Sequence, residues 1–205
     1  MKATTCCEDA IFEALRGHYC GASPTLRRAG EAWYERANAQ CELLSLETGL
    51  RVDVIAGVFA VTSPMSSWAE QLRYVPRLLR AYKAGVPLSD VRAQCFSQNK
   101  RKAESLLRGE DFDAVAGGRK VRSFRRNLLL DPGPVTVDGW MVRAAFGLLG
   151  DDTTNRTPGV RNVRAPLYDA IEAATALLAR EHGCLPYQAQ ATVWLSARAA
   201  CGYHD

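Results

Sequence analysis

The sequence predicts an all-α protein, a compact multi-helix domain. Apolar residues recur every three to four positions through most of the 205 residues, which is the period of an α-helix. Hydrophobic residues make up 47% of the chain and charged residues 23%, a balance typical of a folded globular protein. We therefore expect one compact α-helical domain over residues 1–205, built from eight to ten short helices.

The N-terminal quarter carries clear helical stripes. Residues 8–19 place three apolar side chains on one face of a helix: Ile11, Leu15 and Tyr19. A similar stripe runs over 25–46. The next segment, VDVIAGVFAV (52–61), is apolar on nearly every side, so it is either a buried strand or a buried helix.

A long helix is expected over 66–85, where serines suited to capping precede the apolar stripe and Gly85 ends it. Pro76 lies well inside this stripe and predicts a kink or a break there. The remaining elements are shorter. In order, they are helices at 88–96, at 99–108 and from 119 onward, a turn at 131–134, a polar loop at 151–164, and two closing helices at 165–183 and 185–200.

Composition argues against several classes of protein. No apolar run approaches the about 18–20 residues that cross a bilayer, so no membrane partner is expected. The N-terminus turns acidic where an export signal needs an apolar stretch, which predicts a cytoplasmic protein. Motifs for a nucleophile elbow, a phosphate-binding loop and a His-Glu-x-x-His zinc site are absent from the sequence.

The cysteines predict reduced thiols and no metal site. Their number is odd, and only the first two lie close together, as adjacent residues that make poor co-ligands. With only three histidines in the chain, we expect no metal and no other cofactor. The seven cysteines are Cys6, Cys7, Cys20, Cys41, Cys95, Cys184 and Cys201.

Positive charge gathers in the middle of the chain. Between Lys100 and Arg126 there are nine Lys or Arg against four Asp or Glu, while the whole chain carries only +4. Such an excess suits a phosphate backbone, where binding is largely charge neutralisation. A solvated helix face explains the same charge equally well.

Asp138 stands out in the stretch VTVDGWMVRAAFG. Three β-prone residues precede it, which predicts an extended and buried approach, and an apolar helix starts directly after it. Taken alone, Asp138 is a helix N-cap whose charge suits the helix dipole. Lys120 lies 18 residues upstream, at the head of another helix that follows Gly117-Gly118.

This arrangement resembles the helix-hairpin-helix DNA glycosylases related to endonuclease III. The resemblance rests on two motifs. The first is Gly118-Arg119-Lys120, and the second is Val137-Asp138 with Arg143, in which Asp138 follows Lys120 by 18 residues. VIAGVFAVTSPMSSWAEQLRYV and SQNKRKAESLL are similar to two further segments of that family, in the same order. The resemblance covers residues 53–147, with 1–52 and 165–205 as flanking helices that pack together. Gly139-Trp140 replaces the family's Thr-His after the aspartate.

The resemblance implies a chemistry and a set of roles. A flipped nucleotide would lose its base while the Asp138 carboxylate stabilises the charge on the sugar or activates the nucleophile. Lys120 would attack the same sugar as a Schiff-base nucleophile, or simply contact a phosphate.

The turn at 116–119 would offer backbone N–H groups to a phosphate. The expected DNA-binding residues are Gly117, Gly118, Arg119, Arg122, Arg126, Lys100 and Lys102. The expected base-pocket or wedge residues are Ser63, Met65, Trp68 and Trp140, for which core packing is the alternative. Gln188 and Gln190 are either inward amides that read a base edge or solvent-exposed side chains.

Three functions fit these observations. The first is a DNA glycosylase-like enzyme acting on a modified or damaged base. The second is a DNA base-modification enzyme on the same fold, in which case a phage protein acting in the host cytoplasm is expected. The third is a non-catalytic DNA-binding module. In each case the partner is DNA and the expected state is a monomer.

Overall fold

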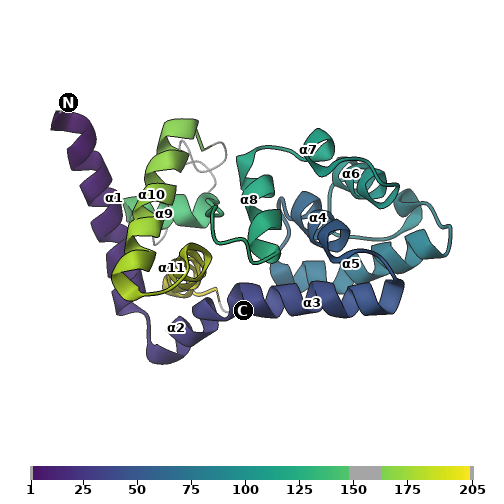
Figure 1. The fold of residues 1–205 in the computed structure, drawn as a ribbon, viewed down its shortest axis with the longest axis horizontal. Coiled ribbons are helices and arrows are strands. Elements are labelled where there is room, and N and C mark those ends of the chain that lie inside the picture. The colour runs from purple at the N-terminus through teal and green to yellow at the C-terminus, as the bar shows by residue number, and fades with distance from the viewer. Residues whose placement is uncertain (1, 148–162, 204–205) are drawn as a thin grey trace. The chain divides into compact units, whose positions relative to one another are not determined.

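A computed structural model describes residues 2–147 and 163–203 of the chain (Figure 1). Within these ranges it contains eleven α-helices, one 3₁₀ turn and no strand, so the prediction of an all-α fold is confirmed. Most of the predicted loop at 151–164 lies outside the described residues. The elements are α1 (Lys2–Gly21), α2 (Pro24–Glu31), α3 (Trp33–Thr48), α4 (Val52–Thr62), α5 (Trp68–Lys83), η1 (Leu88–Asp90), α6 (Ser97–Leu107), α7 (Phe112–Val115), α8 (Arg119–Leu128), α9 (Gly139–Phe146), α10 (Ala165–His182) and α11 (Pro186–Ala200).

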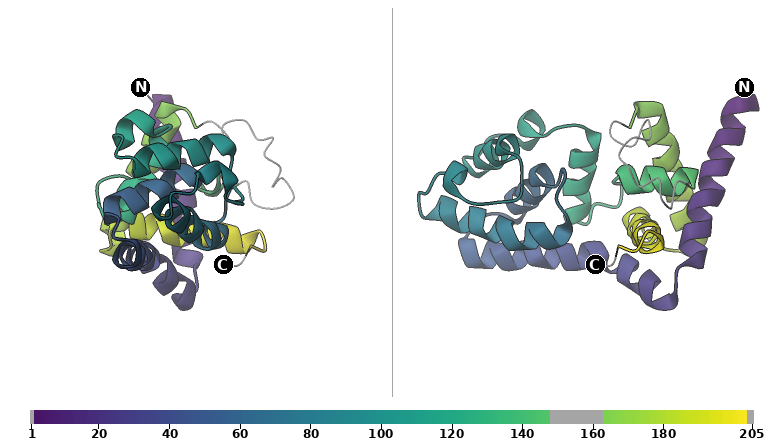
Figure 2. Two further views of the ribbon diagram at one scale, coloured as in Figure 1. Left: turned by 90° about the vertical axis from the view of Figure 1, so that its right-hand side faces the viewer. Right: turned by 180° about the vertical axis from the view of Figure 1, so that it is seen from behind.

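The helices form two compact units. Unit 1 joins the two ends of the chain, Met1–Glu35 and Asp131–Asp205, and unit 2 is the continuous middle, Arg36–Leu130. In unit 1, α1 packs against α9, α10 and α11, and α2 packs against α11. The right-hand view of Figure 2 shows α1 passing beside α11, which is seen end-on. The expectation of one domain over 1–205 stays a prediction.

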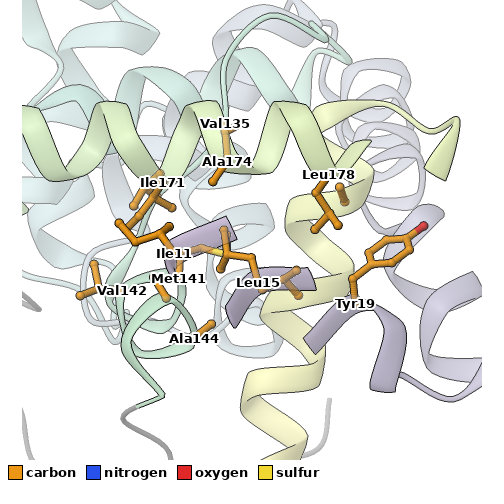
Figure 3. Close-up of a cluster of buried hydrophobic side chains, with 14 of the residues drawn as sticks. Ile11, Leu15, Tyr19, Val135, Met141, Val142, Ala144, Ile171, Ala174 and Leu178 are labelled. Atoms are coloured by element: carbon orange, nitrogen blue, oxygen red, sulfur yellow. The ribbon is translucent and has the colours of Figure 1, made fainter. Parts of the chain in front are cut away.

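The core of unit 1 is built from the helical stripes that the sequence predicts. Ile11, Leu15 and Tyr19 of α1 are almost completely buried. They pack with apolar residues of α9 and α10, including Met141 and Ile171 (Figure 3). Amphipathic helices from the two ends of the chain thus cover one another's apolar faces, which is the main favourable contribution to folding.

The segment before α9 is extended and buried, as its β-prone residues predict. Val135 and Val137 are no more than 1% exposed. Over residues 2–147 and 163–203 no strand pairs with this segment, and side chains of α10 bind its backbone instead. The Val135 N–H donates to Glu172 Oε1 (2.9 Å), while Tyr168 Oη accepts from the Val137 N–H (3.2 Å) and donates to the Val135 carbonyl (2.8 Å). These bonds satisfy backbone groups that would otherwise be buried without partners.

The core of unit 2 is centred on α4, the segment that the sequence left open between strand and helix. It is a helix, and residues 55–62 are buried. It packs against α5, α6 and α8. Gly57 lets the side chains of Leu106 and Phe112 pack close to the backbone of α4, because a Cβ added there would lie 3.2 Å from Leu106 and 3.3 Å from Phe112. A helix bonds its own backbone, so it can be buried on every side without a partner sheet.

Two local predictions were wrong. The stripe at 25–46 divides into α2 and α3 at Ala32. The chain also forms a short helix over Phe112–Val115 that the sequence did not indicate, which raises the helix count above ten. Of the kink or break predicted at Pro76, the break does not form, because α5 continues through the proline. Four buried side chains on either side of the proline offset its cost: Tyr74, Val75, Leu78 and Leu79.

The prediction of a helix over 88–96 was also wrong, except for the first residues of that segment. Only the 3₁₀ turn η1 forms, and Val91 is already extended. The ammonium of Lys100 explains this local structure, since it donates to the carbonyls of Ser89 (3.2 Å) and Val91 (2.9 Å). Those carbonyls are therefore satisfied without a continuing helix.

We predict that Gly30→Ala weakens unit 1. A Cβ at Gly30 would lie 2.5 Å from the Thr192 Cα atom, closer than packed atoms allow, so α2 and α11 must separate. We expect a loss of about 1–3 kcal/mol in the free energy of unfolding, measured by urea denaturation with circular dichroism. Gly17→Ala is the matched control. Nothing lies within 4 Å of its Cβ position, so this change should stabilise α1 by about 0.5–1 kcal/mol. Equal effects of the two changes would contradict the close α2–α11 contact.

Candidate functional site at Asp138

Asp138 is the N-cap of α9. Its backbone is extended, and its Oδ1 atom accepts hydrogen bonds from the backbone N–H groups of Trp140 (2.9 Å) and Met141 (3.1 Å). These bonds satisfy two donors that have no partner within the helix. The capping role that the sequence predicts is therefore present, and it occupies only one of the two carboxylate oxygens.

The second oxygen is held by Trp194 of α11. The indole Nε1–H donates to Asp138 Oδ2 at 3.0 Å, across 56 residues of sequence. Packing of α9 against α11 brings the two groups together. No local pattern in the sequence predicts this bond, because it depends on how two distant helices pack. Three N–H groups thus point at one half-buried carboxylate.

Trp140, which the resemblance offers as a wedge, lies in a cluster of aromatic and arginine side chains. The guanidinium of Arg143 lies 4.8 Å from the centre of the Trp140 ring, and Tyr203 packs edge-on against that ring at 5.3 Å. The guanidinium of Arg198 lies 4.4 Å from the centre of the Trp194 ring. These contacts favour the core-packing interpretation of Trp140. Both tryptophans donate hydrogen bonds to Asp138, and each ring has a positively charged guanidinium beside it.

A buried polar pair lies in the same unit. Tyr34 Oη donates to Gln190 Oε1 at 2.9 Å, and both residues are no more than 3% exposed. Burial raises the pKa of Tyr34 far above its usual value, and the negative charge of Asp138 adds to this shift. Tyr34 therefore stays a hydrogen-bond donor at any physiological pH. The inward position expected as one option for Gln190 is present, but its carbonyl oxygen is bound within the protein.

Gln188 is likewise part of an internal network. Its amide donates to Glu35 Oε1 at 2.8 Å and its carbonyl accepts from the Leu185 N–H at 3.0 Å. Tyr187 donates to the same Glu35 oxygen at 3.3 Å, and burial together with the Glu35 charge raises the pKa of Tyr187 to about 12. These bonds tie the start of α11 to the start of α3.

Lys120 lies in unit 2, at the second residue of α8. The N-cap is Gly118, and no side chain caps the helix. Lys102 of α6 lies beside this turn, since a Cβ at Gly117 would lie 3.6 Å from its Nζ atom. The structure thus brings Lys102 to the head of α8, where the contiguous predicted residues 117–120 lie. A helix N-terminus with nearby cations is suited to an anion.

The other predicted DNA-binding residues differ in how they are held. The Arg122 guanidinium donates to the Asp113 carboxylate (3.1 Å) and to the Asp113 backbone carbonyl (3.1 Å). The Lys100 ammonium donates to the backbone carbonyls of Ser89 and Val91. Arg119 and Arg126 have exposed side chains on α8. Unit 2 as a whole contains 16 Lys or Arg and 9 Asp or Glu, a net charge of +7. The positive charge of the chain therefore resides in unit 2.

Two of the three candidate pocket residues in unit 2 are engaged in contacts within that unit. Ser63 is buried, and its hydroxyl donates to the Ala60 carbonyl at 2.9 Å. Trp68 packs against Phe59 with ring centres 4.9 Å apart. Met65 differs, because it is 77% exposed and its backbone is left-handed, with φ at 65°. A non-glycine residue held in this conformation while its apolar side chain faces solvent is a candidate for contact with a ligand.

The candidate residues are divided between the units. Asp138 and Trp140 belong to unit 1, whereas Lys120, the other predicted DNA-binding residues, Ser63, Met65 and Trp68 belong to unit 2. Over residues 2–147 and 163–203, no group of three or more His, Cys, Asp or Glu side chains is arranged to hold a metal ion. Among the helices of the same residues, none has the length and apolar character needed to cross a bilayer.

The fold and site define an all-α protein with a fixed carboxylate in one unit and a basic helix N-terminus in the other. The chain belongs to a family of unknown function (DUF7178), whose model matches residues 1–200. No curated protein and no solved structure matches the chain significantly.

We predict that Asp138 and Trp194 are energetically coupled. In Asp138→Asn the amide oxygen can still cap α9, but the amide NH₂ then faces the indole N–H, so two donors meet. We expect Asp138→Asn to lower the free energy of unfolding by about 1 kcal/mol in the wild-type protein. The same substitution should lower it by less in a protein that already carries Trp194→Phe. Urea denaturation of the four proteins in this double-mutant cycle measures the difference.

Asp111 provides the control for this cycle. Asp111 is exposed, and its Oδ1 atom caps α7 through the N–H groups of Asp113 and Ala114. Asp111→Asn should change stability by less than about 0.5 kcal/mol, because Asn caps helices as well as Asp. Additive effects of the Asp138 and Trp194 changes would contradict the hydrogen bond between them.

Proposed function

We propose that the protein is a DNA glycosylase-like enzyme that acts on a flipped, modified or damaged base. The observation that carries the proposal is the Asp138 carboxylate, fixed by three N–H donors directly after a buried extended segment. It occupies the place of the aspartate in the glycosylase-like motif. Lys120 precedes it at the interval that the motif expects.

The chemistry would proceed at the sugar of the flipped nucleotide. As the glycosidic bond breaks, the electron pair leaves with the base and positive charge develops on the deoxyribose. A carboxylate that is already oriented stabilises this charge without having to reorganise. Asp138 is suited to this role because the protein holds both of its oxygens before any substrate binds.

Unit 2 supplies the features expected of a DNA-binding surface. Its net charge of +7 favours a phosphate backbone, and the head of α8 combines backbone N–H groups with Lys102 and Lys120. Met65 is suited to enter the space that a flipped base leaves, since its apolar side chain is exposed. Arg119 and Arg126 would contact the strand from the exposed side of α8.

The first test is activity on duplexes that each carry one modified base. Free base and abasic sites are measured by chromatography and by alkaline cleavage, and altered nucleosides would indicate base modification instead. We expect Asp138→Asn to lower the rate by about a thousandfold or more while DNA binding survives, because the change removes the charge that acts in the transition state. Asp111→Asn, the same change at a cap in unit 2, should leave the rate within about twofold. An Asp138→Asn variant as active as the wild type would overturn the proposed mechanism.

Lys120 separates a lyase from a simple glycosylase. If its amine attacks the sugar, borohydride should trap a covalent protein–DNA adduct, and Lys120→Arg should abolish the adduct because a guanidinium does not form the Schiff base. Lys120→Arg keeps the positive charge, so DNA affinity should stay within about threefold. An adduct that persists in Lys120→Arg would show that another amine is the nucleophile.

A second candidate function is a non-catalytic DNA-binding module. It is favoured by one observation: the cap of α9 and the Trp194 indole already give the Asp138 carboxylate a structural role. In this case no duplex yields a product, and affinity for DNA falls steeply as salt concentration rises. Product formation that depends on Asp138 would exclude it.

A further inference from the structure

We propose that Trp194 is a positioning residue for Asp138, fixing the orientation in which the carboxylate acts. The inference rests on the proposed function and adds to it a residue outside the glycosylase-like segment at 53–147. Trp194 comes from α11 and reaches Asp138 only through the packing of unit 1.

The cap restrains the carboxylate through one oxygen only. Rotation about the bond between Cβ and the carboxylate is opposed there by the two hydrogen bonds that Oδ1 accepts from the N–H groups of Trp140 and Met141. The Trp194 indole binds Oδ2 at 3.0 Å and adds a restraint on the opposite oxygen. With both oxygens held, the plane of the carboxylate is set by the fold, which is what a preorganised electrostatic stabiliser requires.

The indole is itself held in place. Its ring packs edge-on against Trp33 at 6.0 Å between ring centres, and the Arg198 guanidinium lies 4.4 Å from its centre. Arg198 is four residues further along α11, so it lies on the same face of the helix. The donor that orients Asp138 is thus built into a packed cluster and does not depend on the substrate.

The hydrogen bond also influences which role Asp138 can take. Three N–H donors occupy most of the positions at which the Asp138 carboxylate could accept a hydrogen bond from a water molecule. Asp138 is therefore better suited to stabilise positive charge on the sugar than to take a proton from water.

Trp194→Phe tests the inference, since it keeps an aromatic ring and removes only the N–H donor. With a duplex that the wild type processes, we expect kcat to fall about tenfold and KM to change by less than about twofold. A fall in kcat with KM nearly unchanged is the result expected when an interaction made only in the transition state is weakened. A purely structural role of Trp194 would leave the kcat of the folded enzyme unchanged.

Tyr187→Phe is the matched control. It removes one hydrogen-bonding group from an aromatic residue of the same helix, and that group binds Glu35. Its kcat and KM should match those of the wild type. In a ¹H–¹⁵N spectrum, the indole signal that Trp194→Phe removes should shift upfield in Asp138→Ala, because the indole loses its acceptor.

The two proposals fail in different ways. If the wild type is active and Trp194→Phe leaves kcat unchanged, the inference alone is overturned. An indole signal that does not respond to Asp138→Ala also overturns it. A wild type that releases no base from any duplex overturns the proposed function, and the positioning role falls with it even when the indole signal shifts.

Discussion

The structure of unit 1 depends on how the buried backbone at 135–137 is satisfied. This segment brings the chain back from unit 2 and lies in the core without a neighbouring strand. Tyr168 and Glu172 of α10 supply the hydrogen bonds that a sheet would otherwise provide. Because an unpaired backbone group in this position costs about 1–3 kcal/mol, these two side chains fix the register of the segment and hence the place of Asp138.

The parts of the fold that rest on local pattern could be predicted from the sequence. The stripe of Ile11, Leu15 and Tyr19 is buried as its spacing indicates, and the extended approach to Asp138 follows from three β-prone residues. The cap of α9 was also predictable, since Asp before an apolar helix is a strong local signal. Each of these features is decided within a few residues of sequence.

The parts that depend on distant packing could not be predicted. Trp194 meets Asp138 across 56 residues, and Tyr34 meets Gln190 across 156. Local pattern also misjudged 88–96, because the lysine that binds its carbonyls comes from the next helix. The continuity of α5 through Pro76 has a similar cause, since tertiary packing outweighs the local preference of one residue. The sequence identified the carboxylate of the candidate site and missed the group that orients it.

The discontinuous make-up of unit 1 has a consequence for the order of folding. Unit 2 is one continuous stretch, so its contacts can form as soon as the middle of the chain has left the ribosome. α1 is made before α9, α10 and α11, which cover its apolar face. The native partners of Ile11 and Leu15 are therefore missing until α11 has been made. Bringing together segments so far apart in sequence is entropically costly, so the closing of unit 1 should be the slow step of folding.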